Sequence, residues 1–233
     1  CMVEFVIDAN LGIVPEWEKS NVKNYDKDEF WGYYHKYVSM DLGVKDKTAA
    51  LFAVYDFLEA KLFILDEFVM SGPQMTTDKL AKEIREKEQK TFGSDKVYRR
   101  VADNNNLLLL QDLTTLHGLT FVPTTKSSLE AMVNRLRLWI KQGKVVVSPN
   151  CKELIGCIET GIWKKNRKEF DRSPLYGHFD ALASLIYLIR NVRETINPIP
   201  ASYNLSQDQH FMEKRNIETT KNVSMLKRMF RLN

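Results

Sequence analysis

The chain has 233 residues, of which 44% are hydrophobic and 27% are charged, so it can bury one large core and is not disordered throughout. Its net charge of +4 permits binding to nucleic acid without requiring it. The cysteines Cys1, Cys151 and Cys157 form neither a disulfide framework nor a zinc-binding pattern, which favours a reducing, intracellular setting. No run approaches the ~20 apolar residues that a membrane-spanning helix needs.

The first half of the chain predicts an antiparallel meander. Strand-like runs occupy residues 37–41, 48–57 and 61–70, and the short turns between them favour pairing as neighbours. The preceding segment, 1–30, begins with Cys-Met-Val-Glu, which is neither a signal peptide nor a usual initiator. We therefore expect residues 1–30 to be the linker-like start of an excised fragment.

Helices and strands alternate in the remainder of the chain. Helices are expected over 77–90, 107–116, 129–141, the segment after 150, and 181–192; strands are expected over 97–103, 119–122 and 145–147. Predicted helix starts include Asn106, a capping box of Ser127 with Glu130, and Asn150 with Glu153. This order predicts an α/β domain over 31–197, with a mixed sheet flanked by helices on both faces, and a basic tail over 198–233.

Three aspartates lie at the ends of these elements. Asp41 ends the first meander strand, Asp103 ends the strand after the first helix, and Asp180 begins the last apolar helix. Such positions can converge at one edge of a sheet, where the carboxylates would repel one another unless a cation held them. Oxygen ligands without histidine or cysteine favour Mg²⁺ or Mn²⁺. The alternative is that each aspartate is merely a cap or a turn residue.

Motifs for nucleotide binding are missing from the sequence. It contains neither GxxxxGK[ST] nor GxGxxG after a strand, so this part of the protein is not expected to bind ATP or a dinucleotide.

The acidic segments resemble a known family. VSMDLG (38–43), VADN (101–104) and GHFDALASL (177–185) are similar to the three acidic motifs in the nuclease domain of the large terminase subunit of tailed bacteriophages, and VPEW (14–17) is similar to the segment that joins the ATPase motor of that family to its nuclease. The resemblance implies a ribonuclease H-like fold, in which an antiparallel three-strand meander is extended by parallel strands.

The resemblance also implies an activity. It is that of a Mg²⁺- or Mn²⁺-dependent endonuclease that cuts concatemeric double-stranded viral DNA during genome packaging, with two ions held by Asp41, Asp103 and Asp180. The expected partners are the ATPase motor of the full-length chain, the portal protein and the small terminase subunit, in the host cytoplasm during virus assembly. Many relatives carry a further acid where this chain has Phe179 or Ala183, so the ligands of the second ion are left open.

Further candidate residues are polar or basic. His178 could orient water or touch the scissile phosphate, or could simply form a hydrogen bond at the helix start. Lys126 could meet phosphate or be an exposed neighbour of a helix cap. A basic cluster could neutralise DNA phosphates without reading bases, or could be a solvated loop; it comprises Lys164, Lys165, Arg167 and Lys168, with Arg172 nearby.

Two other functions compete with the terminase nuclease. One is a resolvase- or transposase-type nuclease of the same fold. The other is a non-catalytic scaffold that only binds DNA or the portal protein.

Overall fold

The computed structural model describes residues 11–25, 30, 32–43, 47–71, 76–125, 127–172, 178–201 and 203. The strands are β1 (His35–Asp41), β2 (Lys47–Asp56), β3 (Lys61–Ser71), β4 (Val97–Asp103), β5 (Val122–Thr124) and β6 (Val145–Val147). The helices are η2 (Lys19–Asn21), α1 (Thr77–Phe92), α2 (Leu107–Thr115), α3 (Leu129–Lys141), α4 (Lys152–Thr160) and α5 (Asp180–Asn191). The chain divides into two compact units, Cys1–Ile196 and Asn197–Asn233, and all these elements belong to the first.

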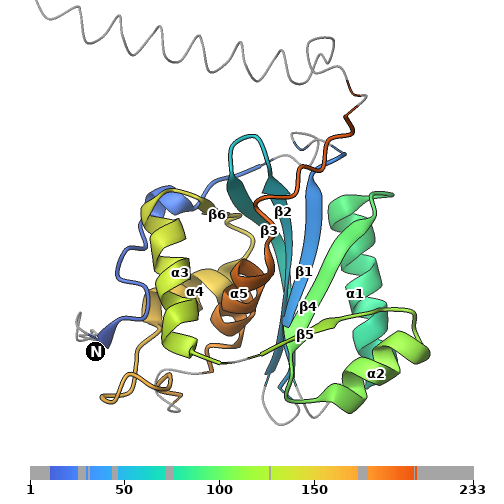
Figure 1. Cartoon of the computed structure of the whole chain (residues 1–233). Coiled ribbons are helices and arrows are strands. Elements are labelled where there is room, and N and C mark those ends of the chain that lie inside the picture. Colours follow the sequence, from blue (N-terminus) through green and yellow to red (C-terminus); the bar gives the residue numbers. More distant parts are fainter. Residues whose placement is uncertain are drawn as a thin grey trace, which may run out of the picture. The chain divides into compact units, whose positions relative to one another are not determined.

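The strands form one mixed sheet of six strands in the order β5-β4-β1-β2-β3-β6. The first three strands form the predicted antiparallel meander. Strand β4 pairs in parallel with β1, β5 with β4, and β6 with β3. Figure 1 shows α3, α4 and α5 on one face of the sheet and α1 and α2 on the other. The predicted mixed sheet with helices on both faces is confirmed.

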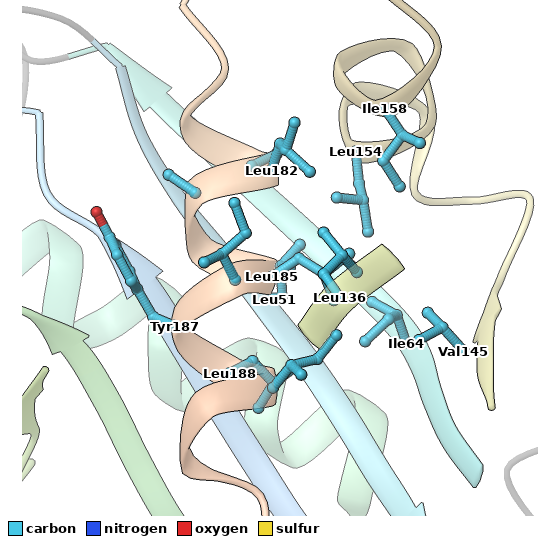
Figure 2. Packing of buried hydrophobic residues seen from close by; sticks show 14 of the residues in the cluster. Leu51, Ile64, Leu136, Val145, Leu154, Ile158, Leu182, Leu185, Tyr187 and Leu188 are labelled. Atoms are coloured by element: carbon cyan, nitrogen blue, oxygen red, sulfur yellow. The ribbon is translucent and has the colours of Figure 1, made fainter. Parts of the chain in front are cut away.

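Helix α5 is the centre of the larger core. Its residues from Asp180 to Ile189 are all buried, as expected of a helix that is apolar around most of its circumference. The helix lies across β1, β2 and β4. Its leucines pack against side chains from both the sheet and the covering helices, among them Leu51, Ile64, Leu136 and Leu154 (Figure 2). In this way the apolar contacts of α5 fix the position of its first residue, Asp180.

The described part of the N-terminal segment packs on the same domain. Ile13 and Val14 are buried in the core that surrounds α5. The backbone N–H of Ile13 donates to the carbonyl oxygen of Gly161 at 2.9 Å, and that of Lys23 donates to Val147 at 3.0 Å. Residues 11–23 are therefore held against α4 and β6 by both apolar and backbone contacts.

Several predicted boundaries agree closely with the structure, and others are wrong. Strands β4 and β6 and helix α3 have the predicted bounds, and Asn106 caps α2 as predicted. The predicted capping box is wrong, because α3 begins after Ser128, which has a left-handed backbone (φ 61°) and makes no side-chain cap. The strand expected over 119–122 is instead β5, with Pro123 inside it. Proline is tolerated there because β5 is an edge strand.

The predicted start of α4 is also wrong, because a distant glutamate replaces the local cap. The residue before α4 is Cys151, which makes no side-chain cap. Glu67 of β3 instead accepts hydrogen bonds from the backbone N–H groups of Glu153 at 2.7 Å and Leu154 at 2.9 Å. Burial raises the pKa of Glu67, while the two backbone donors act in the opposite direction. This contact ties the first turn of α4 to the sheet.

No described helix has the length and apolar character needed to cross a membrane.

The first prediction concerns the ion pair that fastens the N-terminal segment to α3. Arg137 donates to both carboxylate oxygens of Glu16, at distances between 2.6 and 3.0 Å, and these bonds hold the pKa of Glu16 below its usual value. Because the folded-state pKa is lowered, the stabilisation is present above the unfolded value of ~4.3 and is lost as the pH falls through the lowered pKa. Glu16→Gln should therefore lower the free energy of unfolding by about 1 kcal/mol at pH 7 and by much less at pH 3.

Denaturant unfolding at the two pH values measures this difference. Glu159→Gln, which alters an exposed side chain of α4, serves as the control. Equal stability of the Glu16 variant and the wild type at pH 7 would contradict a contribution from this pair.

Candidate metal and DNA site

The parallel pairing of β1 with β4 brings two of the predicted acids to the same edge of the sheet. Ser39 lies opposite Val101, and Met40 lies opposite Ala102. Asp41 and Asp103 are the next acidic positions in this register and end their respective strands. Residues that pair in this way project from the same face, and neighbouring strands lie about 4.8 Å apart. The two carboxylates therefore start from adjacent backbone positions.

Two hydrogen bonds place the third acid at that edge. The Ser39 hydroxyl donates to the carbonyl oxygen of Ser184 at 2.7 Å, and the backbone N–H of Arg193 donates to the Tyr37 hydroxyl at 3.1 Å. Later residues of β1 thus meet earlier residues of α5, so the helix runs antiparallel to the strand. Its first residue, Asp180, consequently lies toward the end of β1 that carries Asp41. An aspartate in the first turn also interacts favourably with the helix dipole.

All three aspartates are buried. Their exposed fractions are 5% for Asp41, 0% for Asp103 and 4% for Asp180. Burial in a medium of low dielectric disfavours ionised carboxylates and strengthens the repulsion between them. This environment differs from that of solvated turn or cap residues, which was the simple alternative.

Tyr187 shows that the three charges act on one place. It projects from α5 on the side away from α4 (Figure 2), and its side chain is buried. Burial raises the pKa of its hydroxyl above the usual range. The negative charges of Asp41, Asp103 and Asp180 raise this pKa further. Because such effects weaken with distance, the three carboxylates converge around this hydroxyl, which stays protonated and can donate a hydrogen bond.

Tyr187 was missed by the sequence analysis. It lies seven residues after Asp180, which is close to two helical turns, so both residues occupy the same face of α5. That spacing was the signal that could have identified it.

The three acids do not form a closed ligand shell. Within the described ranges, no three histidine, cysteine, aspartate or glutamate side chains are gathered so that they could hold a metal ion. The donor chemistry nevertheless fits Mg²⁺ or Mn²⁺, because the groups at this edge are carboxylates. At the two positions where relatives carry a further acid, Phe179 and Ala183 are buried apolar residues. The predicted ligand set, including that of a second ion, therefore stays a prediction.

His178 lies directly beside this edge. Its side chain is exposed, and its carbonyl oxygen accepts the backbone N–H of Asp180 at 2.8 Å. This backbone contact helps to start α5, as the structural alternative expected. The role of the exposed imidazole in catalysis stays a prediction.

The predicted basic cluster lies on a loop beside α5. The loop is closed by pairing of Trp163 with Phe170, both of which are buried. Lys164 forms an ion pair with Glu169 at 2.6 Å. Lys165, Arg167 and Lys168 are exposed. Lys126 lies outside the described residues.

A cavity of about 500 Å³ separates this loop from α5. Its lining combines basic side chains of the loop with the helix face that carries Tyr187, and includes Lys164, Lys168, Arg172, Ala183, Ile186 and Tyr187. The charge of Arg172 acts on Tyr187 in the direction opposite to the aspartates. Cationic groups therefore flank the acidic edge on this side.

Comparison with known proteins identifies a sequence relative. No protein-family model matches the chain. The chain is 28% identical over 159 residues to the terminase large subunit of Escherichia phage T5, and the match covers 65% of this chain and 35% of that protein. The chain thus spans about a third of the length of the curated relative it matches.

Solved structures with the same fold are large terminases. The large terminase of one thermophilic bacteriophage matches with a TM-score of 0.64 and 14% identity over 78% of this chain and 46% of that one. The nuclease domain of the bacteriophage SPP1 large terminase, solved with bound Mn, gives 0.52 and 15% over 74% and 93%. The large terminase nuclease of a second thermophilic phage, G20c, solved with bound magnesium, gives 0.51 and 19% over 68% and 82%.

The sheet order and flanking helices therefore define a ribonuclease H-like α/β domain of the kind found in large-terminase nucleases. In sequence, the chain is a homologue of the terminase large subunit. The predicted resemblance and fold class are both confirmed.

A second prediction follows from the burial of like charges. Asp41→Asn should raise the melting temperature in EDTA by roughly 2–4 °C, because loss of one charge relieves repulsion worth about 1 kcal/mol. Mn²⁺ should raise the melting temperature of the wild type and have much less effect on the variant. Asp112→Asn, at an exposed position of α2, is the matched control and should behave like the wild type. A destabilised Asp41 variant that still responds fully to Mn²⁺ would count against a shared acidic site.

Proposed function

We propose that the chain is the endonuclease domain of a viral DNA-packaging terminase, which cuts concatemeric double-stranded DNA by metal-dependent phosphodiester hydrolysis. The observation that carries the proposal is the meeting of three buried aspartates, from β1, β4 and α5, at one edge of a terminase-type sheet. Related nuclease domains have been solved with bound manganese or magnesium, which supports the same choice of metal here.

The aspartates would be the metal ligands of this chain. Asp41, Asp103 and Asp180 would hold two Mg²⁺ or Mn²⁺ ions, which would activate the attacking water and stabilise the leaving oxygen. The protonated hydroxyl of Tyr187 would donate to one of these carboxylates and so help to orient it. The exposed imidazole of His178 would orient water or contact the scissile phosphate.

The loop beside α5 would bind the DNA backbone. Lys165, Arg167 and Lys168 are exposed, and Lys168 also lines the cavity next to Tyr187. We propose that these residues, with Lys164 and Lys126, bind phosphates in a way that depends on salt rather than on base sequence.

The proposed context is a longer packaging protein. The thermophilic bacteriophage relative with the TM-score of 0.64 is a large terminase of which the matched region is less than half, and the full-length form of this chain would likewise contain an ATPase motor. In this arrangement residues 1–30 would follow the motor, 31–197 would form the nuclease, and 198–233 would be a basic tail. The portal protein and the small terminase subunit would be its partners in the host cytoplasm during virus assembly.

A nicking assay tests the proposed activity. The 233-residue chain should nick and linearise supercoiled plasmid with Mn²⁺ or Mg²⁺ and be inactive in EDTA. Asp41→Asn should reduce the rate by at least ~100-fold, because it removes a metal ligand, whereas Asp112→Asn should cleave normally. Persistent absence of cleavage by folded wild-type protein that still binds DNA would favour the non-catalytic scaffold instead.

The salt dependence of DNA binding tests the basic loop. Replacing Lys164, Lys165 and Arg167 by Ala should lower the slope of log K against log salt by about 0.9 for each phosphate contact that is lost. Alanine at three exposed lysines of α1, on the other face of the sheet, provides a variant of equal charge: Lys79, Lys82 and Lys90. Equal slopes for the two triple variants would assign the loop to solvent.

A further inference from the structure

A lysine at the start of β2 lies at the same edge and on the same face as the aspartates. Asp41 pairs with Ala49 across the β1–β2 ladder. Lys47 precedes Ala49 by two residues, so its side chain projects from the same face of the sheet as that of Asp41. Because β1 and β2 are antiparallel, the start of β2 lies where β1 ends. The sequence analysis did not identify Lys47, whose position becomes evident only with the strand register.

The side chain of Lys47 is held near the site by an ion pair. Its Nζ donates to Oε1 of Glu153 at 3.0 Å. Glu153 lies in the first turn of α4, and its own backbone N–H is anchored by Glu67 at 2.7 Å. The side chains of Lys47 and Glu153 remain 52% and 38% exposed, so the ammonium group can exchange partners without leaving a buried charge. An ion pair this exposed contributes little to stability.

The electrostatics of Lys47 connect it to the acidic site. The hydrogen bond to Glu153 raises the pKa of Lys47, so the side chain is a cation at neutral pH. The charge of Asp180 also acts to raise this pKa, which places the ammonium group within electrostatic reach of that carboxylate. A cation beside three carboxylates is suited to receive a phosphate group that approaches the same edge.

We propose that Lys47 is a substrate-contacting residue, whose ammonium group leaves Glu153 and binds a non-bridging oxygen of the phosphodiester at the aspartate site. This inference rests on the proposed nuclease function. It assigns Lys47 to the reacting phosphate rather than to the DNA backbone in general. Glu153 would hold the lysine in place until DNA arrives.

The test compares two lysines of the β2–β3 hairpin. Lys61 forms a similar ion pair with Glu59 at 2.9 Å, with side-chain exposures of 39% and 30%, and lies at the opposite end of the strands. Lys47→Met should reduce the rate of Mn²⁺-dependent plasmid cleavage by roughly 10- to 100-fold, because it removes a cation from the reacting phosphate. Lys61→Met, with the same change in charge, should cleave as fast as the wild type. Lys47→Arg should restore most of the lost rate.

A further variant separates substrate contact from a structural ion pair. Glu153→Gln breaks the pair but keeps the ammonium group of Lys47, so it should retain cleavage if the lysine acts on phosphate. If Lys47 matters only through its pairing, Glu153→Gln and Lys47→Met should lose the same activity and the same thermal stability, and that result overturns the proposal.

The remaining outcomes distinguish this proposal from the proposed function. If Lys47→Met and Lys61→Met both cleave like an active wild type, the role of Lys47 is overturned while the nuclease function stands. A wild-type chain that fails to cleave in Mn²⁺ overturns both.

Discussion

The parallel pairing of β1 with β4, crossed by α5, is the constraint on which the site depends. Parallel neighbours end at the same edge of a sheet, so this pairing brings Asp41 next to Asp103 although 62 positions separate them in the sequence numbering. The hydrogen bond from Ser39 to the backbone of Ser184 then fixes α5 against β1. A shift of either contact would move one carboxylate away from the others.

The core of α5 makes this arrangement of like charges tolerable. One side of the helix packs its leucines against the sheet and against α3 and α4, whereas the other carries Asp180 and Tyr187 toward the acidic edge. Apolar burial of this extent stabilises the helix enough to offset repulsion among a few carboxylates. The same repulsion provides a reason for the acids to bind divalent cations, which links the packing of the core to the proposed chemistry.

Local sequence patterns were sufficient for most of the fold. The bounds of β4 and α3 agreed with prediction because alternating or helical apolar patterns and nearby polar residues determine them. Contacts between distant residues could not be predicted: Glu67 replaces the local cap of α4, and an edge position allows Pro123 within β5. For the same reason the three aspartates were apparent as element ends, whereas Tyr187 and Lys47 required the helix face and the strand register.

The central claim is that Asp41, Asp103 and Asp180 together bind divalent cations. Crystals of the 233-residue chain soaked in Mn²⁺, with anomalous diffraction recorded near the manganese edge, test this most directly. The account predicts anomalous peaks within about 2.5 Å of carboxylate oxygens from all three aspartates. Manganese bound elsewhere at saturating concentration, with these carboxylates uninvolved, would contradict it.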